Sequence, residues 1–132
     1  MLWLSSTRQK LLNDPKRLGR WGEKRCLKFL KKKGYTLVAR NYRTRMGEID
    51  LIMSDRNGAI VFVEVKTRTS EERLRAEEAV TPKKRHKMNK TAKYFIKIYG
   101  IKDKPLRFDV VAIVLSKTGP AEIRHYKNAF RP

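Results

Sequence analysis

Carboxylates and a lysine stand close together in the middle of the chain, in two runs that otherwise have the composition of β-strands. Glu48 and Asp50 occur in GEIDLIM, and Glu64 and Lys66 occur in IVFVEVK. β-branched and aromatic residues dominate both runs, and the sequence Asp-Arg-Asn-Gly between them is typical of a turn. Residues 47–68 therefore predict a β-hairpin that carries acidic groups and an ammonium among hydrophobic neighbours.

The length of the turn decides whether the carboxylates meet. A two-residue loop, Asn57-Gly58, would place Asp50 opposite Val65, with Glu64 on the far face of the sheet. A three-residue loop that ends at Gly58 places Asp50 directly opposite Glu64. Such loops commonly end in a residue with positive φ, which suits glycine, and we predict this register.

Two opposed carboxylates repel each other at a Cβ separation of ~5 Å unless one is protonated or a cation lies between them. Asp50, Glu64 and the backbone carbonyl of Val65, completed by water, suit Mg²⁺ (or Mn²⁺), because these ions prefer oxygen ligands. Lys66 shares a face with Glu64 and would orient a water or stabilise charge on a phosphate. The alternative is that these residues are solvated charges on an open sheet face.

A further carboxylate lies on a helix predicted before the hairpin. Asp14-Pro15 is typical of an N-cap followed by a first turn, and Gly34 is typical of a helix end, so the helix runs to about Lys33. Glu23 falls inside the apolar arc of this helix, and an inward glutamate needs a partner. It is either a third carboxylate at the metal, directly or through water, or the partner of a nearby basic side chain.

A second helix is predicted from Thr81-Pro82, which repeats the capping pattern, to Tyr99, with Gly100 as its end. Lys84 falls near the edge of the apolar stripe of this helix and is expected to reach back towards the acids. Glu48 shares a strand face with Asp50. We expect Lys84 and Glu48 to support the acidic cluster without being direct ligands.

The remaining elements are predicted strands at 36–42, 106–115 and 122–126. Residues 1–13 form either a short helix or an arm that packs on a neighbouring segment. The resulting order, αβββαββ, predicts an α/β fold with a mixed central β-sheet flanked by helices. With 132 residues, the chain is long enough for one domain and too short for two.

The net charge of the chain indicates which class of partner it binds. Lys and Arg number 33 against 13 acids, for a net charge of +20, which favours a polyanion and nucleic acid first. No run approaches the length of a membrane span, so no membrane partner is expected. One cysteine fits a reducing compartment and a cytoplasmic location. Basic residues near the hairpin and the second helix are either solvated or contact phosphates, and the candidates for such contacts are Arg40, Arg43, Arg45, Arg68, Lys83 and Lys87.

The spacing of Asp50 and Glu64-Val65-Lys66 resembles the D-(x)n-ExK signature of the PD-(D/E)XK nuclease superfamily, which includes restriction endonucleases and archaeal Holliday-junction resolvases. More closely, the chain from about Gly19 onwards resembles the YraN-like family of small bacterial predicted endonucleases. The resemblance implies a restriction endonuclease-like core, a metal site at Asp50 and Glu64, and a functional Glu23. The matching pieces are Gly22-Glu23, 41–43, 47–52, 62–68, 78–82, Lys84, 107–110 and 128–130.

These observations predict a Mg²⁺-dependent endonuclease that hydrolyses DNA phosphodiester bonds. The resemblance to junction resolvases extends this to branched DNA and a homodimer. The alternative is a non-catalytic nucleic-acid-binding module, for DNA or for RNA, including a ribosome-associated one, which the charge supports equally well. The acidic cluster favours the endonuclease over the binding module, because carboxylates beside a phosphate would weaken the binding of nucleic acid.

Overall fold

The predicted hairpin forms as β2 (Gly47–Ser54) and β3 (Ile60–Arg68) in the computed structural model, which describes residues 2–131 and side chains from residue 7 onwards. The N–H of Asp55 donates to the carbonyl of Ala59 at 3.0 Å, which leaves residues 56–58 as the loop. Gly58 has a φ of 84°, a value that favours glycine. The predicted three-residue loop is confirmed.

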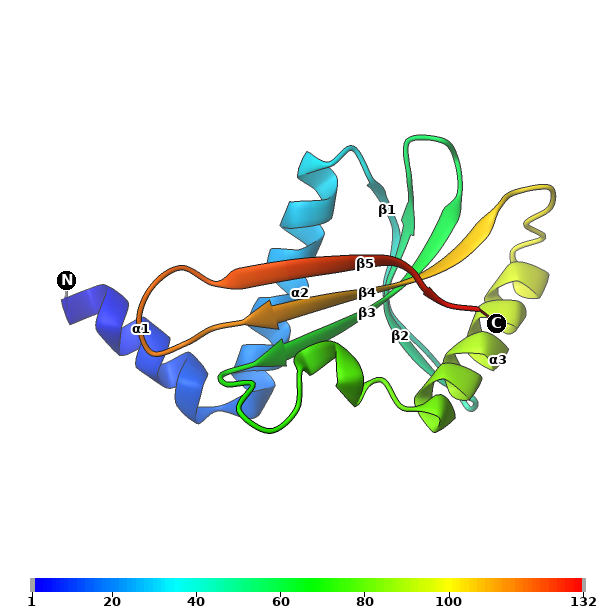
Figure 1. The fold of residues 1–132 in the computed structure, drawn as a ribbon. Helices are drawn as coiled ribbons and strands as arrows, with labels where there is room; N and C mark the ends of the chain where they lie inside the picture. Colours follow the sequence, from blue (N-terminus) through cyan, green and yellow to red (C-terminus); the bar gives the residue numbers. More distant parts are fainter. Residues whose placement is uncertain (1, 132) are drawn as a thin grey trace.

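The hairpin lies within a five-stranded sheet in the order β1-β2-β3-β4-β5 (Figure 1). β3 and β4 (Leu106–Val114) are parallel, whereas β1 (Thr36–Thr44) and β5 (Glu122–Phe130) pair antiparallel with their neighbours. The parallel connection from β3 to β4 passes through a 3₁₀ turn (Ala76–Ala79) and α3 (Pro82–Ile98). The protein therefore has the predicted mixed α/β fold, which is compatible with a restriction endonuclease-like core.

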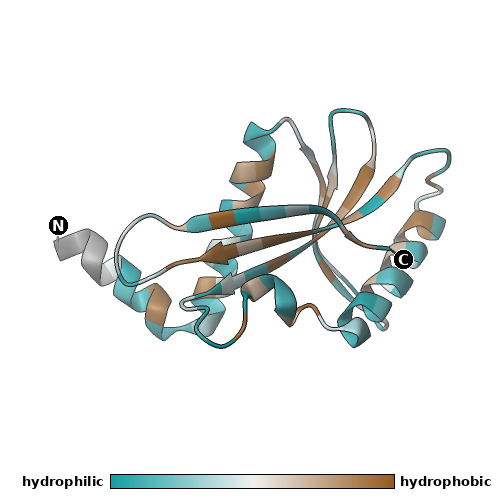
Figure 2. Ribbon diagram, viewed as in Figure 1, coloured by the Kyte–Doolittle hydropathy of each residue, from teal (hydrophilic) through white to brown (hydrophobic). Residues whose placement is uncertain are grey.

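The two long helices cover opposite faces of the sheet. α2 (Pro15–Lys32) packs Cys26 and Leu30 on one hydrophobic cluster, and α3 packs Met88 and Phe95 on the other. Both helices begin as predicted: the Asp14 side chain accepts from the first-turn N–H groups of α2, and Thr81 does the same for α3. In Figure 2 the hydrophobic residues follow the central strands, whereas α3 is largely hydrophilic. No described helix is long and apolar enough to cross a membrane.

The segment before α2 is a helix, α1 (Leu2–Asn13), which resolves the alternative left open for it, although residue 1 lies outside the described part. The Arg8 guanidinium donates to the carbonyls of Ser116 and Gly119, at 3.1 and 2.8 Å, so α1 contacts its own chain at the β4–β5 turn. Trp21 packs against the hydrophobic cluster that contains Cys26 and Leu30. Tyr99, predicted as the end of the second helix, follows α3 directly and is 62% exposed.

The sheet opens between β2 and β3. Their pairing runs from Ser54 and Ile60 only as far as Leu51 and Val63. Beyond that point β2 stays paired with β1, whereas β3 stays paired with β4. Figure 1 shows the β1–β2 pair curving away from β3. The opening starts at the next residue of each strand, Asp50 and Glu64.

Gly22 allows α2 to approach β3 closely at this opening. A Cβ on Gly22 would lie 1.9 Å from Thr67 Oγ1, whereas a Cβ on Gly19 would meet nothing within 4 Å. Gly22→Ala is therefore expected to destabilise the protein by about 1–3 kcal/mol through overpacking. Gly19→Ala, the matched control, is expected to be neutral or to stabilise by about 1 kcal/mol, because alanine favours helix. Urea denaturation measures both, and equal effects at the two positions would contradict this packing.

A buried ionic network ties β4 to β5 on the α2 face. Asp109, which is 0% exposed, contacts Arg107 Nε at 2.9 Å and His125 Nε2 at 2.7 Å. Burial alone would raise the pKa of Asp109, but hydrogen bonds from His125, Arg107 and the Asn128 N–H together lower it. Asp109 is therefore the shared ion-pair partner of Arg107 and His125 in this network.

Asp109→Asn is expected to destabilise the fold by about 3 kcal/mol at neutral pH, because it leaves Arg107 and His125 without their shared anion. Since the pKa of Asp109 is lower in the folded state, its contribution is complete above the unfolded value of about 3.9 and is lost as pH falls through the folded value. The variant should therefore lose less stability than the wild type between pH 5 and 3. The exposed Asp103, whose φ of 58° asparagine also tolerates, provides the control Asp103→Asn. A loss of similar size in that control would contradict the role of the network.

Candidate active site

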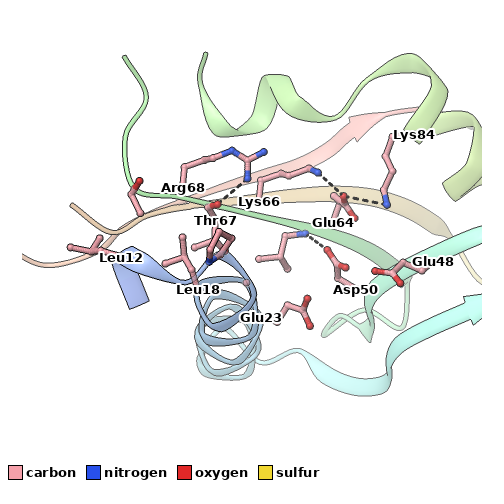
Figure 3. Close-up of a pocket in the computed structure, with 14 residues that line it drawn as sticks. Leu12, Leu18, Glu23, Glu48, Asp50, Glu64, Lys66, Thr67, Arg68 and Lys84 are labelled. Atoms are coloured by element: carbon pink, nitrogen blue, oxygen red, sulfur yellow. Dashed lines mark hydrogen bonds and ion pairs between the residues drawn. The ribbon is translucent and has the colours of Figure 1, made fainter. Parts of the chain in front are cut away.

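A cleft of about 430 Å³ lies at the opening between β2 and β3. α2 forms one wall with Leu18, Gly19 and Glu23, and Lys84 of α3 lies at the other side (Figure 3). The cleft brings together the carboxylates and the lysine that the sequence singled out. The predicted residues that line it are Glu23, Glu48, Asp50, Glu64, Val65, Lys66, Arg68 and Lys84.

Asp50 bridges the opening in the sheet. Its Oδ2 accepts a hydrogen bond of 2.8 Å from the Val65 N–H, which takes the place of strand pairing at this position. Asp50 is 7% exposed and Glu64 is 2% exposed. Burial raises the pKa of Asp50 to about 8, and the nearby Glu64 carboxylate adds to the rise. The predicted register therefore brings two buried acids side by side, where both cannot easily be ionised in the absence of a cation.

The two oxygens of Glu64 have different surroundings. Oε2 lies 3.3 Å from the Lys66 Nζ and 3.7 Å from the Lys84 Nζ. Oε1 is buried and has no hydrogen-bond partner while Asp50 is ionised, and it is the one such side-chain atom among the described residues. A buried carboxylate oxygen without a partner is costly. Lys66 and Lys84 thus orient Glu64, while its second oxygen is left for a ligand.

These donors fit a hard divalent cation. Among the side chains described, no three His, Cys, Asp or Glu residues are grouped so that they could share a metal ion. Mg²⁺ does not require such a cage, because it keeps several waters and is usually held by one or two carboxylates together with substrate phosphates. The Asp50–Glu64 pair, with its unpartnered oxygen, matches that donor set.

Glu23 and Glu48 lie farther out in the same cleft. Figure 3 shows Glu23 extending from α2 towards the side where Asp50 and Glu48 lie. Burial raises the pKa of Glu23, and the Glu48 and Glu64 carboxylates add to the rise, while Arg40 opposes it. Glu48 forms an exposed ion pair with Arg43, with Nε and Oε2 2.8 Å apart. Glu23 thus acts on the cluster by charge, and a role as a ligand through water stays a prediction.

Of the predicted phosphate-contacting residues, Arg68 lines the cleft and the others do not. Arg68 lines the cleft and donates to the Thr67 carbonyl at 2.9 Å. Arg40, Arg45, Lys83 and Lys87 are exposed on β1, the β1–β2 turn and the start of α3. Their contacts with nucleic acid stay predictions.

Two residues that line the cleft were not predicted from the sequence. Leu12 of α1 and Thr67 of β3 line the cleft. Thr67 could have been inferred from Gly22, because a helix glycine on an apolar arc often marks close packing against another backbone. Nothing in the sequence placed Leu12, since it depends on how α1 folds back over α2.

Comparison with known proteins identifies the family. The family model described as "Uncharacterised protein family UPF0102" matches residues 22–113, which include all the carboxylates of the cleft. A UPF0102 protein of Pelotomaculum thermopropionicum is 39% identical over 116 residues, covering 87% of this chain and 96% of the relative. One from Syntrophomonas wolfei is 43% identical over 113 residues, covering 86% and 96%. The resemblance at family level is confirmed: the chain belongs to the uncharacterised protein family UPF0102.

Proposed function

We propose that this protein is a metal-dependent endonuclease that hydrolyses phosphodiester bonds in DNA, with a PD-(D/E)XK-type site at Asp50, Glu64 and Lys66. The observation that carries the proposal is the buried, unpartnered Oε1 of Glu64 beside the Asp50 carboxylate. A protein that only binds nucleic acid gains nothing from two buried acids in a cleft, because they repel phosphate. A cation site that activates phosphate chemistry accounts for them.

The residues of the cleft have separate roles in this proposed reaction. Asp50 and Glu64 would hold the cation, together with the Val65 carbonyl, and Glu23 would contribute through water. Mg²⁺ or Mn²⁺ bound there supplies positive charge that lowers the pKa of a water molecule and offsets the charge of the scissile phosphate. Hydrolysis then forms a bond from the water oxygen to phosphorus and breaks the bond from phosphorus to the leaving sugar oxygen.

Lys66 supplies a second positive charge at the same place. Its Nζ lies 3.3 Å from Glu64 Oε2, and its side chain is 21% exposed, so a phosphate entering the cleft can reach it. An ammonium held in position before the reaction stabilises the charge that develops on the phosphate oxygens. Lys84, 3.7 Å from the same oxygen, keeps Glu64 oriented when Lys66 engages the phosphate.

The net charge and the signature residues support DNA as the substrate. The net charge of +20 supports a polyanion. The D-(x)n-ExK residues are shared with junction resolvases, so branched DNA is the first substrate to test and a homodimer is the first assembly to look for. Basic residues around the cleft would contact the backbone and not the bases, which gives binding without sequence preference.

The proposal is tested by incubating the protein with end-labelled linear, flapped and four-way DNA, in Mg²⁺, in Mn²⁺ and in EDTA. We expect cleavage with either metal, strongest on a branched substrate, and none in EDTA. Equal cleavage in EDTA would point to a contaminating activity or a metal-free mechanism. Tight DNA binding without cleavage of any substrate would favour the non-catalytic module.

A further inference from the structure

A second concave surface lies on α2, outside the acidic cleft. It has a volume of about 530 Å³ and is formed by α2 and the edge strand β1. We call it the α2 groove, and its lining residues are Lys24, Leu27, Lys28, Lys31, Lys32 and Arg40. None of its basic residues takes part in an ion pair within the described part of the chain, and no acid lines it.

The helix sets the spacing of these charges. Lys24, Lys28 and Lys31 stand at positions i, i+4 and i+7, so they share one face of α2 and their Cα atoms rise by about 6 and 10 Å along its axis. Like charges at such spacing repel each other by about 0.2–0.5 kcal/mol per pair. A row of phosphates along a nucleic-acid strand would neutralise this row of ammonium groups and release the counterions of both.

The groove is adjacent to the acidic cleft. Glu23 faces the cleft, and Lys24, the next residue of α2, lines the groove. Arg40 belongs to the groove, and its charge also acts on Glu23. A DNA segment that extends past Glu23 therefore meets the α2 groove next.

We propose that the α2 groove binds the phosphate backbone of DNA beyond the stretch held in the acidic cleft. The inference extends the proposed function and takes DNA as the ligand from it. An anionic membrane suits the surface less well, because Leu27, the apolar residue of the groove, is 9% exposed and offers little surface for insertion.

The test compares a variant that lacks three positive charges in the groove with a control variant that lacks three positive charges on α3. The triple variant Lys24→Gln, Lys28→Gln and Lys31→Gln removes three charges from the groove. The control Lys90→Gln, Lys93→Gln and Lys97→Gln removes three exposed charges from α3. Lysine and glutamine have similar helix propensities, so both variants should fold, which circular dichroism checks. Affinity for a four-way junction and for a linear duplex is measured in EDTA over a range of salt concentrations.

The groove variant is expected to bind the four-way junction about 10-fold or more weakly, with a slope of log K against log salt that is smaller by about two to three. The control is expected to stay close to the wild type. Equal losses in the two variants would overturn the proposal in favour of net charge alone. Unchanged DNA binding would also overturn it. Because binding is measured in EDTA, the result does not depend on whether the protein cleaves DNA.

Discussion

Asp50→Asn is expected to abolish DNA cleavage and, at the same time, to stabilise the metal-free protein. The change removes a cation ligand, and we expect the rate to fall on the order of 10³-fold, since a bound cation is worth several kcal/mol. It also removes one of two adjacent buried carboxylates and places an amide donor near the unpartnered Glu64 Oε1. The unfolding free energy without metal should rise by about 1–3 kcal/mol.

The same variant distinguishes a metal-dependent nuclease from a protein that only binds DNA. Without metal, the raised pKa of Asp50 leaves this carboxyl largely uncharged at neutral pH, so Asp50→Asn removes little charge and is expected to bind DNA in EDTA at least as tightly as the wild type. Glu48→Gln is the matched control, because Glu48 lines the same cleft but forms an exposed ion pair with Arg43. It should retain most of the cleavage and gain no stability. If Asp50→Asn instead lowers stability and leaves cleavage intact, the role of the acidic pair is wrong.

Lys66→Ala is expected to lower the cleavage rate on the order of 10²-fold or more at saturating DNA, while DNA affinity barely changes. The change keeps both carboxylates, and Lys84 still contacts Glu64 Oε2, so the cation site persists. One charge lost among 33 basic residues has little effect on overall DNA affinity. The measurement is single-turnover cleavage in Mg²⁺ paired with a gel-shift titration in EDTA.

Lys83→Ala is the control for Lys66. Lys83 is an exposed lysine at the start of α3, outside the cleft, and the same charge is removed. We expect wild-type cleavage at saturating DNA and slightly weaker binding. A rate loss in Lys83→Ala as large as in Lys66→Ala would show that general basicity, and not a positioned ammonium, supports cleavage.

Local sequence signals predicted the fold well where one residue fixes the backbone. Gly58 determines the loop length and therefore brings Asp50 opposite Glu64, because a shift of one residue would move a side chain to the other face. Asp14 and Thr81 fixed the starts of the two long helices. These signals work because turns and caps depend on neighbouring residues alone.

The features that the sequence did not predict depend on long-range packing. The docking of α1 relies on Arg8 reaching carbonyls more than 100 residues away. The divergence of β2 from β3 has no local signature, although it creates the cleft and lets Asp50 accept from the Val65 N–H. Helix periodicity placed Glu23 inward but could not tell a direct ligand from a carboxylate at the rim, since that difference is set by how closely Gly22 packs on Thr67.

Titration of the metal-free protein with Mg²⁺ in a calorimeter tests the cation site most directly, because it needs no knowledge of the substrate. We expect the wild type and Lys66→Ala to bind Mg²⁺ through the Asp50–Glu64 pair and to melt at a higher temperature when Mg²⁺ is bound. Asp50→Asn should show neither effect. If the wild type shows no heat of binding and no thermal shift with millimolar Mg²⁺ or Mn²⁺, the buried carboxylates do not form a cation site, and the proposed nuclease mechanism is wrong.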